Sequence, residues 1–413
     1  MKLAVIADDL TGALDTGVKF AGSPGGVQVW AGGAFQPQDA TGDVVVVDGE
    51  LRHKSPKQAR EECAALVRRV LEAGAQRLYI KTDSALRGNI GPMFQGALDA
   101  SGWGFAAFAP AFPQMDRVTR KGIHYIQGVP IHQSVFGQDP FEPVRSSRVA
   151  DLFRDFSGDV RLFAPGDPVE VEGNGPTLGI FDGECLEDFH RIAAALERAG
   201  RFRLLGGCAG FASQLAGILG LTGGARRLEP VKKPLLVLCG SLNPISKEQL
   251  SQGERQGDVR LTLESGLLTP AQVEGPQGDA LEGRILEAME PGRDVLLDTA
   301  GPVPGREAEG SRETVAQALG ALLFRLLRRP EIEGFQPMVV GGDTLMGLMD
   351  RLPAAQLSPL AEPVPGVVLS QVQVEAGKER TLISKSGGFG GRDLFSQLKS
   401  ALDQGPAFGP FQG

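Results

Sequence analysis

The chain has 413 residues, of which 42% are hydrophobic and 22% are charged, and its formal net charge is -8. This composition is typical of a globular protein, and the length suits about two or three domains. An acidic chain with no basic tract is a poor candidate for binding nucleic acid or an anionic membrane surface, so we expect neither partner.

The first apolar run is typical of a central strand in a parallel sheet. Residues 3–7 are all apolar, and the run ends at the paired carboxylates of Asp8 and Asp9. Thr11 and Gly12 then begin a helical pattern, so one acid could be a helix cap, but capping does not explain both. The run is too short for a signal peptide, and no other run suits a membrane span, so we expect a cytoplasmic protein.

A later strand end carries the strongest indication of a site. Residues 79–88 read Tyr-Ile-Lys-Thr-Asp-Ser-Ala-Leu-Arg-Gly, which is a short buried strand that runs into polar residues and then a glycine. Ligands of α/β proteins bind at the carboxyl ends of strands. Two cations, a carboxylate and hydroxyl groups suit a small, polyhydroxylated anion, although a solvated turn is the alternative interpretation. The side chains concerned are Lys81, Asp83, Ser84 and Arg87.

Arg52 follows another predicted strand, at residues 44–48. An arginine at a strand end could hold a carboxylate through two parallel hydrogen bonds, although a lone arginine is usually only a surface residue. Ser55 and Pro56 are typical of the first positions of a helix, which we expect to run to about Ala73.

The rest of the first half alternates strands with helices. We predict further strands at residues 27–30, 104–109, 159–163, 177–182 and 204–207, and helices at 90–100, 186–199 and ending near 219. The stretch 122–147 is irregular apart from a hairpin-like piece at 123–130. Interleaved apolar residues indicate that this long stretch is ordered.

A linker divides the chain into two parts. Residues 222–234 are rich in glycine, proline and basic residues. We therefore predict domains at residues 1–225 and 234–413, joined by a linker at 226–233. The expected fold class is α/β, with a mainly parallel sheet flanked by helices in each domain. The four cysteines include no CxxC pair, so we expect neither structural zinc nor a disulfide framework.

The second half begins a new α/β series with glycine at three strand ends. Strands are predicted at residues 235–239, 259–263, 295–298 and 338–340, with a meander at 367–374 and 381–384. The glycine-bearing ends are Gly240-Ser241, Gly341-Gly342-Asp343-Thr344 and Gly387-Gly388-Phe389-Gly390. Glycine lets a phosphate approach the backbone, and a following helix presents free N–H groups to it. Three such ends in one half favour a nucleotide-phosphate site over ordinary tight turns.

Taken together, the motifs resemble the four-carbon acid sugar kinase family, in the family's order and over nearly the whole chain. The matching pieces are residues 6–13 (IADDLTGA), 81–88 (KTDSALRG), 110–113 (PAFP), 128–130 (GVP), 139–140 (DP), 240–241 (GS), 341–344 (GGDT) and 385–390 (KSGGFG). The chain departs from the family's pattern at Gly49, Leu51, Asn243 and Met115-Asp116-Arg117.

The resemblance implies a two-domain, ATP-dependent kinase with its active site in the interdomain cleft. The N-terminal domain of such enzymes holds a four-carbon sugar acid such as threonate, erythronate or a keto-tetronate, and the terminal hydroxyl is phosphorylated. The C-terminal domain holds ATP. By the same likeness, the residues that contact ATP should be Ser241, Gly341, Gly342, Asp343, Thr344, Gly387 and Gly388.

The charged residues and Ser84 at these strand ends then receive hypothetical roles. Arg87, Lys81 and Arg52 are expected to bind the substrate carboxylate, and Asp8, Asp9 and Ser84 to hold its hydroxyls. Asp83 and Asp9 are the two candidates for the group that takes the proton of the acceptor hydroxyl. Mg²⁺ should bridge the ATP phosphates, mostly through waters; Asp343 is one candidate ligand, although it could equally be a helix cap.

Two other functions stay open at this point. One is a sugar-acid oxidoreductase, which the missing Gly-x-Gly-x-x-Gly fingerprint disfavours. The other is a non-catalytic sensor of sugar acids and nucleotides, which the intact glycine loops disfavour. The expected partners are small molecules, namely a sugar acid and ATP, and a homodimer is one possible state of assembly.

Overall fold

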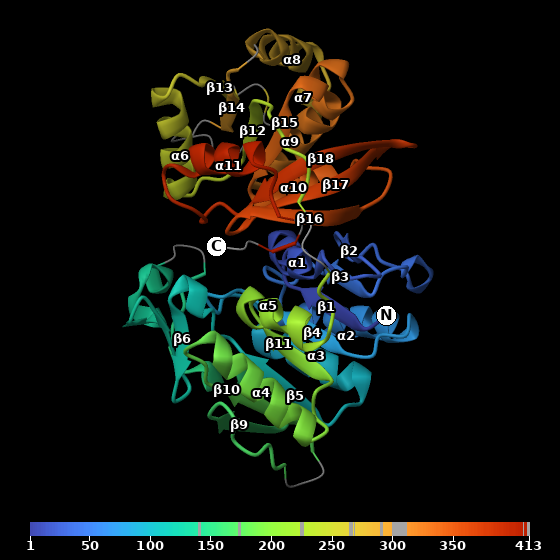
Figure 1. Ribbon diagram of the computed structural model, residues 1–413, viewed down its shortest axis with the longest axis vertical. Helices are drawn as coiled ribbons and strands as arrows, with labels where there is room; N and C mark the ends of the chain where they lie inside the picture. Colours follow the sequence, from blue (N-terminus) through green and yellow to red (C-terminus); the bar gives the residue numbers. More distant parts are fainter. Residues whose placement is uncertain are drawn as a thin grey trace. The chain divides into compact units, whose positions relative to one another are not determined.

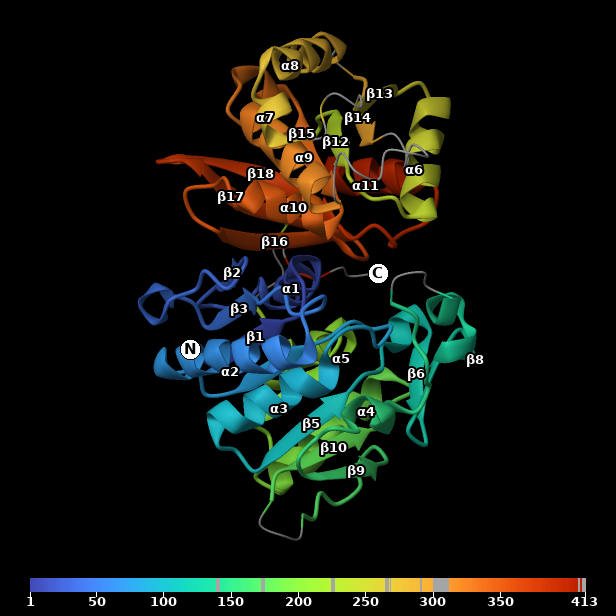
Figure 2. The same cartoon turned by 180° about the vertical axis from the view of Figure 1, so that it is seen from behind.

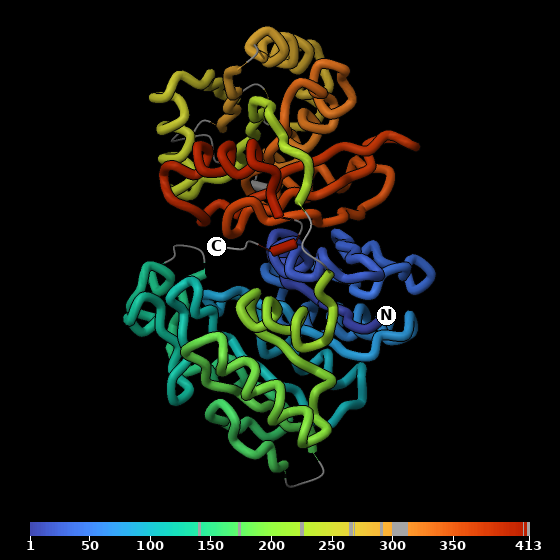
Figure 3. The backbone as a smooth tube through the Cα atoms, in the orientation of Figure 1, coloured from blue at the N-terminus to red at the C-terminus, as the bar shows by residue number. Residues whose placement is uncertain are grey.

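The computed structural model describes residues 1–413 except 139–141, 172–174, 224–226, 264–266, 268, 290–291, 300–311, 408 and 411–413. The chain divides into two compact units, Met1–Gly223 and Gly224–Gly413, and each is made from one continuous stretch of chain (Figure 3). The Asp139-Pro140 pair of the sequence pattern lies outside the described residues.

The first unit is built on a parallel sheet. Its strands lie in the order β2-β3-β1-β4-β11-β5-β10-β9, and neighbouring strands run parallel. The strands are β1 (Leu3–Ala7), β2 (Val27–Trp30), β3 (Val44–Asp48), β4 (Leu78–Lys81), β5 (Phe105–Ala109), β9 (Asp159–Phe163), β10 (Thr177–Phe181) and β11 (Leu204–Gly207). β1 and β5 are apolar throughout, and β3 is apolar up to Asp48, because helices cover both faces of the sheet.

Two layers of helix sandwich this sheet. Helices α2 and α3 pack together on one face, which is in front in Figure 2, and α4 and α5 lie on the other face, with α1 beside α5 (Figure 1). Their bounds are α1 (Leu10–Gly17), α2 (Pro56–Glu72), α3 (Ile90–Ser101), α4 (Leu186–Arg198) and α5 (Ala209–Ile218). Ser55 caps α2 by accepting a hydrogen bond from the Gln58 N–H, as the sequence predicts.

A small antiparallel sheet projects from the first unit. It consists of β6 (Arg117–Arg120), β7 (Ile123–Ile126) and β8 (Val129–Pro130). The sequence predicts a hairpin-like piece here but not β6. The sheet stands close to the carboxyl end of β4, because His124 on β7 contacts the main chain of Ser84.

The second unit has a mixed sheet. Its strands lie in the order β13-β14-β12-β15-β18-β17-β16; the first five run parallel, and β17 runs antiparallel to both β18 and β16. The strands are β12 (Leu235–Cys239), β13 (Val259–Leu263), β14 (Val295–Thr299), β15 (Gln336–Val340), β16 (Gln356–Val364), β17 (Val367–Glu375) and β18 (Lys378–Lys385). The mainly parallel α/β fold that the sequence predicts is therefore confirmed.

Helices again cover both faces of the second sheet. Helices α9 and α10 pack together on one face, and α6 and α11 lie on the other (Figures 1 and 2). The helices are α6 (Pro244–Arg255), α7 (Pro270–Val273), α8 (Pro276–Ala288), α9 (Arg312–Leu327), α10 (Gly342–Met349) and α11 (Leu394–Asp403). Within the described part of the chain, no helix combines the length and the apolar character needed to cross a membrane.

Candidate active site

The predicted residues of the first unit gather at one edge of its sheet. β1 pairs with β3 on one side and with β4 on the other, so the chain reverses its direction of travel across the sheet between β1 and β4. Such a switch point leaves a crevice at the carboxyl ends of the strands, where ligands of α/β proteins bind. Asp8 and Asp9 follow β1, and Lys81 and Asp83 lie at the end of β4.

Arg52 ties the two carboxylates of β1 together. Its Nε donates to Asp8 Oδ2 at 2.8 Å and its Nη1 donates to Asp9 Oδ2 at 2.5 Å. Asp9 also caps α1, because its Oδ1 accepts the Gly12 N–H at 2.7 Å. Both sequence interpretations of the acid pair therefore apply: Asp9 is a helix cap and a member of a charged cluster.

The two acids differ in their electrostatics. Burial raises the pKa of Asp8 above its ordinary value. The positive charge of Arg52 lowers this pKa and the negative charge of Asp9 raises it, but burial is the largest effect. For Asp9, burial is outweighed by Arg52 and Lys81, so its pKa lies below the ordinary value. Asp8 Oδ1 is buried and has no hydrogen-bond partner, so this oxygen is an available acceptor.

Asp83 and Arg87 form a second ion pair. Arg87 lies four residues after Asp83, and its Nε donates to Asp83 Oδ2 at 2.6 Å. Burial would raise the pKa of Asp83, but Arg87 and Arg52 together outweigh it and hold that pKa well below the usual range. Asp83 is therefore ionised at neutral pH and is a weak base.

Two other cations at this edge, Lys81 and Arg117, form no direct ion pair within the described residues, although Asp9 and Asp83 act on them at longer range. Lys81 is only 4% exposed, and its Nζ donates to the Thr82 carbonyl at 3.0 Å. Arg117, at the start of β6, donates to the Ser84 hydroxyl, while its Nε is buried without a partner. Neither cation forms an ion pair with a carboxylate in the described part of the chain. Arg52 and Arg87 are thus already ion-paired with aspartates, whereas Lys81 and Arg117 form no direct ion pair within the described residues.

Arg117 was not among the residues that we assigned a role from the sequence. Its guanidinium and that of Arg87 both lie over the ring of Phe136, at 5.4 and 5.5 Å from the centroid. The sequence contains two signals for it: its position in the loop after β5, and its place in Met115-Asp116-Arg117, where the chain departs from the family's pattern. Neither signal reveals that β6 folds back toward Ser84.

A buried histidine holds the Ser84 loop. His124 is fully buried, its Nδ1 lies 2.9 Å from the Thr119 hydroxyl, and its Nε2 lies 3.3 Å from the Ser84 carbonyl. The carbonyl can only accept, so Nε2 carries the proton and Nδ1 accepts from Thr119. Burial lowers the pKa of His124 to about 4, which keeps the ring neutral at physiological pH.

The three glycine loops of the second unit lie side by side. They follow β12, β15 and β18, which are consecutive parallel strands of the sheet. Ser241, Gly341 and Gly387 therefore meet at one edge, as the sequence predicts for a phosphate site. Gly341 has φ 117°, a conformation that other residues rarely adopt, and it is the N-cap of α10.

Close contacts explain why glycine stands at two of these positions. A Cβ at Gly387 would overlap the Ser241 hydroxyl, and a Cβ at Gly240 would overlap the hydroxyl of Thr344. Asp343 lies in the first turn of α10. The Ser241, Thr344 and glycine positions thus form a shallow cradle of hydroxyls and main-chain N–H groups, which suits phosphate oxygens.

Three charged residues lie next to this edge, around Asp298 of the neighbouring strand β14. Asp298, near the end of β14, accepts hydrogen bonds from Lys247 of α6 and, at 2.5 Å, from Arg260 of β13. The sequence analysis assigned these residues no role. Within the described residues, no group of three or more His, Cys, Asp or Glu side chains is arranged to hold a metal ion.

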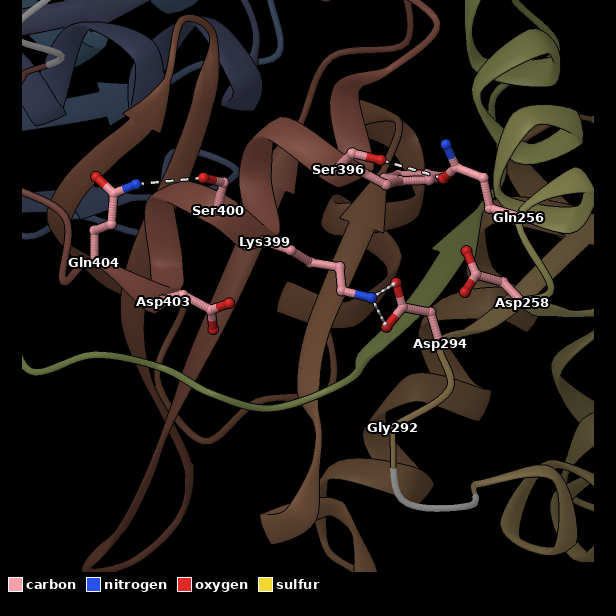
Figure 4. Close-up of a pocket in the computed structure, with 10 residues that line it drawn as sticks. Gln256, Asp258, Gly292, Asp294, Ser396, Lys399, Ser400, Asp403 and Gln404 are labelled. Atoms are coloured by element: carbon pink, nitrogen blue, oxygen red, sulfur yellow. Dashed lines mark hydrogen bonds and ion pairs between the residues drawn. The ribbon is translucent and has the colours of Figure 1, made fainter.

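A pocket lies at the opposite end of these strands. It has a volume of about 500 Å³, and Asp258 and Asp294, which precede β13 and β14, form part of its wall (Figure 4). Lys399 of α11 points into it and binds Asp294 at 3.1 Å. The pocket is therefore at the amino ends of the parallel strands, opposite the glycine loops.

Comparisons with known proteins define the class of protein first. A sugar-binding N-terminal domain profile matches residues 3–215, and a nucleotide-binding C-terminal domain profile matches residues 236–395. The first match covers the charged edge around β1 and β4, and the second covers the three glycine loops. The chain thus combines a sugar-binding domain with a nucleotide-binding domain.

Relatives that match over nearly the whole of both chains indicate a more specific class of protein. The chain is 29% identical to a D-threonate kinase of Bordetella bronchiseptica, over 97% of both chains. It is 27% identical to a 3-oxo-tetronate kinase of Pseudomonas fluorescens, over 98% of both, and 24% identical to a D-erythronate kinase of Heliobacterium modesticaldum, over 95% of this chain and 94% of that one. The chain belongs to the four-carbon acid sugar kinase family.

Solved structures share the fold. A Salmonella typhimurium protein described as a putative tRNA synthase superposes with a TM-score of 0.76 at 21% identity, over 96% of this chain and 98% of that one. A Haemophilus influenzae protein superposes with a TM-score of 0.71, also at 21% identity, over 96% and 99%. At this identity the likeness supports the fold alone.

Proposed function

We propose that the chain is an ATP-dependent kinase that phosphorylates the terminal hydroxyl of a four-carbon sugar acid of the D-threonate, D-erythronate or 3-oxo-tetronate type. The observation that carries this proposal is the pairing pattern at the edge of the first sheet. There, two cations that form no direct ion pair within the described residues, Lys81 and Arg117, lie among carboxylate and hydroxyl groups. An anionic polyol supplies both the missing negative charge and the hydroxyls.

Binding of the acid would use the unpaired cations first. Lys81 and Arg117 are the groups whose charge a ligand carboxylate would balance. Arg52 and Arg87 remain proposed contacts, but each must share its guanidinium with the aspartate that it already binds. The same ion pairs hold the acidic side chains in place for the ligand.

The hydroxyls of the acid would meet Asp8, Asp9 and Ser84. Asp8 offers a buried oxygen that lacks a donor, which a substrate hydroxyl would supply. Ser84 is fixed on both sides, because its side chain accepts from Arg117 and its carbonyl accepts from His124. The substrate would therefore bind to a largely preorganised edge.

For the proton of the acceptor hydroxyl, Asp83 and Asp9 stay the two proposed acceptors. Both have lowered pKa values, so each would take the proton only late in transfer, when the hydroxyl has become strongly acidic. Asp8, whose pKa is raised, is a stronger base on electrostatic grounds, and its unpartnered oxygen adds it as a third candidate.

Nucleotide binding would fall to the second unit. We assign Ser241, the loop Gly341–Thr344 and Gly387-Gly388 to the ATP phosphates, because their hydroxyls and N–H groups lie at one edge of three neighbouring strands. Mg²⁺ carried by the nucleotide would neutralise charge on the phosphates, with Asp343 as its proposed protein ligand. Transfer requires the acid and the γ-phosphate to meet; the interdomain cleft stays a prediction of the sequence.

Identification of the product tests this function. The protein is incubated with Mg-ATP and each candidate acid, and the product is analysed by mass spectrometry and phosphorus NMR. We expect one added phosphoryl group, coupled to the protons of the terminal methylene. A phosphoryl group on the carboxylate or on an inner hydroxyl would contradict the proposed reaction.

A further inference from the structure

The last residue of β18 is a buried lysine that the proposed chemistry has not yet used. Lys385 is 1% exposed, and its Nζ donates to the carbonyls of Ser386 at 2.9 Å and Gly387 at 3.2 Å. It stands directly before the glycine turn that we assign to the nucleotide. Lysine is among the residues that are least often fully buried without a partner charge.

The positive charge of Lys385 has no counter-ion. No carboxylate in the described part of the chain forms an ion pair with it. Its register partners on β15 and β17 are Val340 and Val367. Among the described residues, the titratable group that acts on it electrostatically is Cys239 of β12. This thiol lies in turn near Lys247 and Asp298. Burial accordingly lowers the pKa of Lys385 to about 8.

In the glycine turn beside Lys385, carbonyl groups accept hydrogen bonds, whereas two of the N–H groups donate none within the described residues. Besides the two carbonyls that bind Lys385, Ser246 donates to the Gly387 carbonyl at 2.7 Å, and Gln249 donates to the carbonyls of Phe389 and Gly391 at 2.9 and 3.0 Å. The carbonyls of the turn are therefore held inward. By contrast, the N–H groups of Gly387 and Gly388 donate no hydrogen bond within the described residues.

We propose that Lys385 is the charge-balancing and positioning residue of the nucleotide site: its ammonium holds the glycine turn with the N–H groups outward, and the phosphates of the bound nucleotide supply its missing counter-ion. Binding of the anionic nucleotide and protonation of Lys385 are then linked. This proposal rests on the proposed function, because it requires that the second unit bind a nucleotide.

The linkage has a definite sign. Without nucleotide, Lys385 is only partly protonated near pH 8, since its charged form is buried and uncompensated. A nearby phosphate favours the charged form, so binding draws a proton from solution. The phosphate oxygens are already ionised at pH 8 and contribute little to this uptake. A lysine that only fills space or only donates to carbonyls would produce no such linkage.

Calorimetry of ADP binding tests the proposal. Titrations of the full chain at pH 8, in two buffers of different ionisation enthalpy, measure the number of protons taken up for each ADP bound. For the wild type we expect about half a proton, because a group with a pKa near 8 is half protonated there. Lys385→Met should lose most of this uptake and bind ADP at least about tenfold more weakly.

Two further variants separate charge from structure. Lys385→Gln keeps a donor for the carbonyls but carries no charge, so it should also lose the proton uptake. Lys378→Met removes a partly exposed lysine, paired with Glu375, from the start of the same strand and should change neither affinity nor uptake. Without nucleotide, Lys385→Met should melt no lower than the wild type, because it loses an uncompensated buried charge.

Each other outcome has a distinct meaning. If Lys385→Met and Lys385→Gln bind ADP with wild-type affinity and proton uptake, Lys385 does not balance the phosphates and the proposal is wrong. A fall in the melting temperature of ligand-free Lys385→Met, with normal uptake in Lys385→Gln, would mark the lysine as structural and also overturn it. If the wild type binds no nucleotide at all, the proposed function itself fails, and this proposal fails with it.

Discussion

Charge pairing separates the cations at the edge of the first sheet into two kinds. Arg52 and Arg87 form ion pairs with aspartates, whereas the hydrogen bonds of Lys81 and Arg117 go to neutral oxygens. Asp9 acts on Lys81, and Asp83 on Arg117, only at longer range. A buried cation without a counter-ion raises the free energy of the ligand-free protein, and an anionic ligand removes this penalty. We therefore propose that a ligand carboxylate would interact most favourably with Lys81 and Arg117.

Replacement of Arg117 by methionine tests whether this arginine binds the carboxylate of the sugar acid. We expect the KM for the sugar acid to rise about a hundredfold, which is the usual loss of roughly 2–3 kcal/mol for one member of a buried charge pair, while the KM for ATP stays unchanged. Steady-state kinetics with each substrate varied in turn measure both values.

The matched control is Arg120→Met, which removes an exposed arginine paired with Glu184 from the same strand. It should leave both KM values at the wild-type level. Equal losses in Arg117→Met and Arg120→Met, or a larger effect on ATP than on the acid, would show that Arg117 acts through the fold and not on the acid.

Asp83→Asn should abolish most turnover, by about 10²–10⁴-fold, because an amide can neither accept the proton nor pair with Arg87 as a carboxylate does. ATP binding should stay nearly unchanged, since the nucleotide is assigned to the second unit. Turnover and calorimetric binding of ATP are measured on the same preparation. Asp99→Asn, which removes the carboxylate of a surface pair with Arg60, is the control. Full activity of Asp83→Asn would exclude Asp83 as an essential group.

Much of the residue-scale site could be predicted from the sequence, but its partners could not. Lys81, Asp83 and the Asp8–Asp9 pair are visible because each directly follows an apolar strand. The role of Arg117 depends on β6 folding back onto Ser84, a contact between residues 33 positions apart. The pairing of Arg52 with Asp8 and Asp9 likewise depends on the tertiary structure, whereas Arg87 pairs with Asp83 only four residues away.

At the scale of elements, the small sheet β6–β8 is held to the main sheet through His124. Because burial lowers the pKa of this histidine to about 4, the folded protein binds fewer protons than the unfolded chain between that pH and about 6.5. Its contribution to stability is present above pH 6.5 and is lost as the pH falls to 4. The loss should be about 3 kcal/mol.

Denaturant unfolding of the wild type and of His124→Gln, at several pH values between 4 and 7, measures this contribution. Glutamine can still donate to the Ser84 carbonyl but does not titrate, so its stability should depend less on pH in this window. Other groups titrate here too, and the difference between the two proteins removes their share. Identical pH slopes would show that His124 is not buried as a neutral ring.

The glycine turn after β18 offers a second prediction at this scale. Gly387→Ala would place a methyl group against the Ser241 hydroxyl, so we expect the KM for ATP to rise about tenfold or more while the KM for the acid is unchanged. Gly391→Ala, four residues on, has no atom within 4 Å of the added Cβ and is the matched control. A normal KM for ATP in Gly387→Ala would remove this turn from the nucleotide site.

Elements with a plain apolar pattern were predicted well, whereas β16, whose pattern is interrupted by two prolines, was not. The strands around the sites are short apolar runs that end in polar residues or glycine. β16 was missed because Pro359 and Pro363 interrupt its pattern, and proline normally argues against a strand. The structure accommodates them with two register shifts in the pairing of β16 with β17.

For the whole molecule, the α/β class follows from the regular alternation of strand and helix patterns. Two compact units separate at residues 223 and 224, and profiles of different domain types match each unit. The identity of the acid does not follow in the same way, because the curated relatives carry three different substrate names at 24–29% identity. Differences of one hydroxyl or keto group are decided by single contacts.

The most direct test of the account is ADP release by the wild type with Mg-ATP and a panel of D- and L-threonate, D- and L-erythronate and 3-oxo-tetronates. We predict strong turnover that depends on one acid of the panel and is absent without it. Absence of turnover on every acid, with ATP still bound, would contradict the assignment of a four-carbon acid to the charged edge around Lys81 and Arg117.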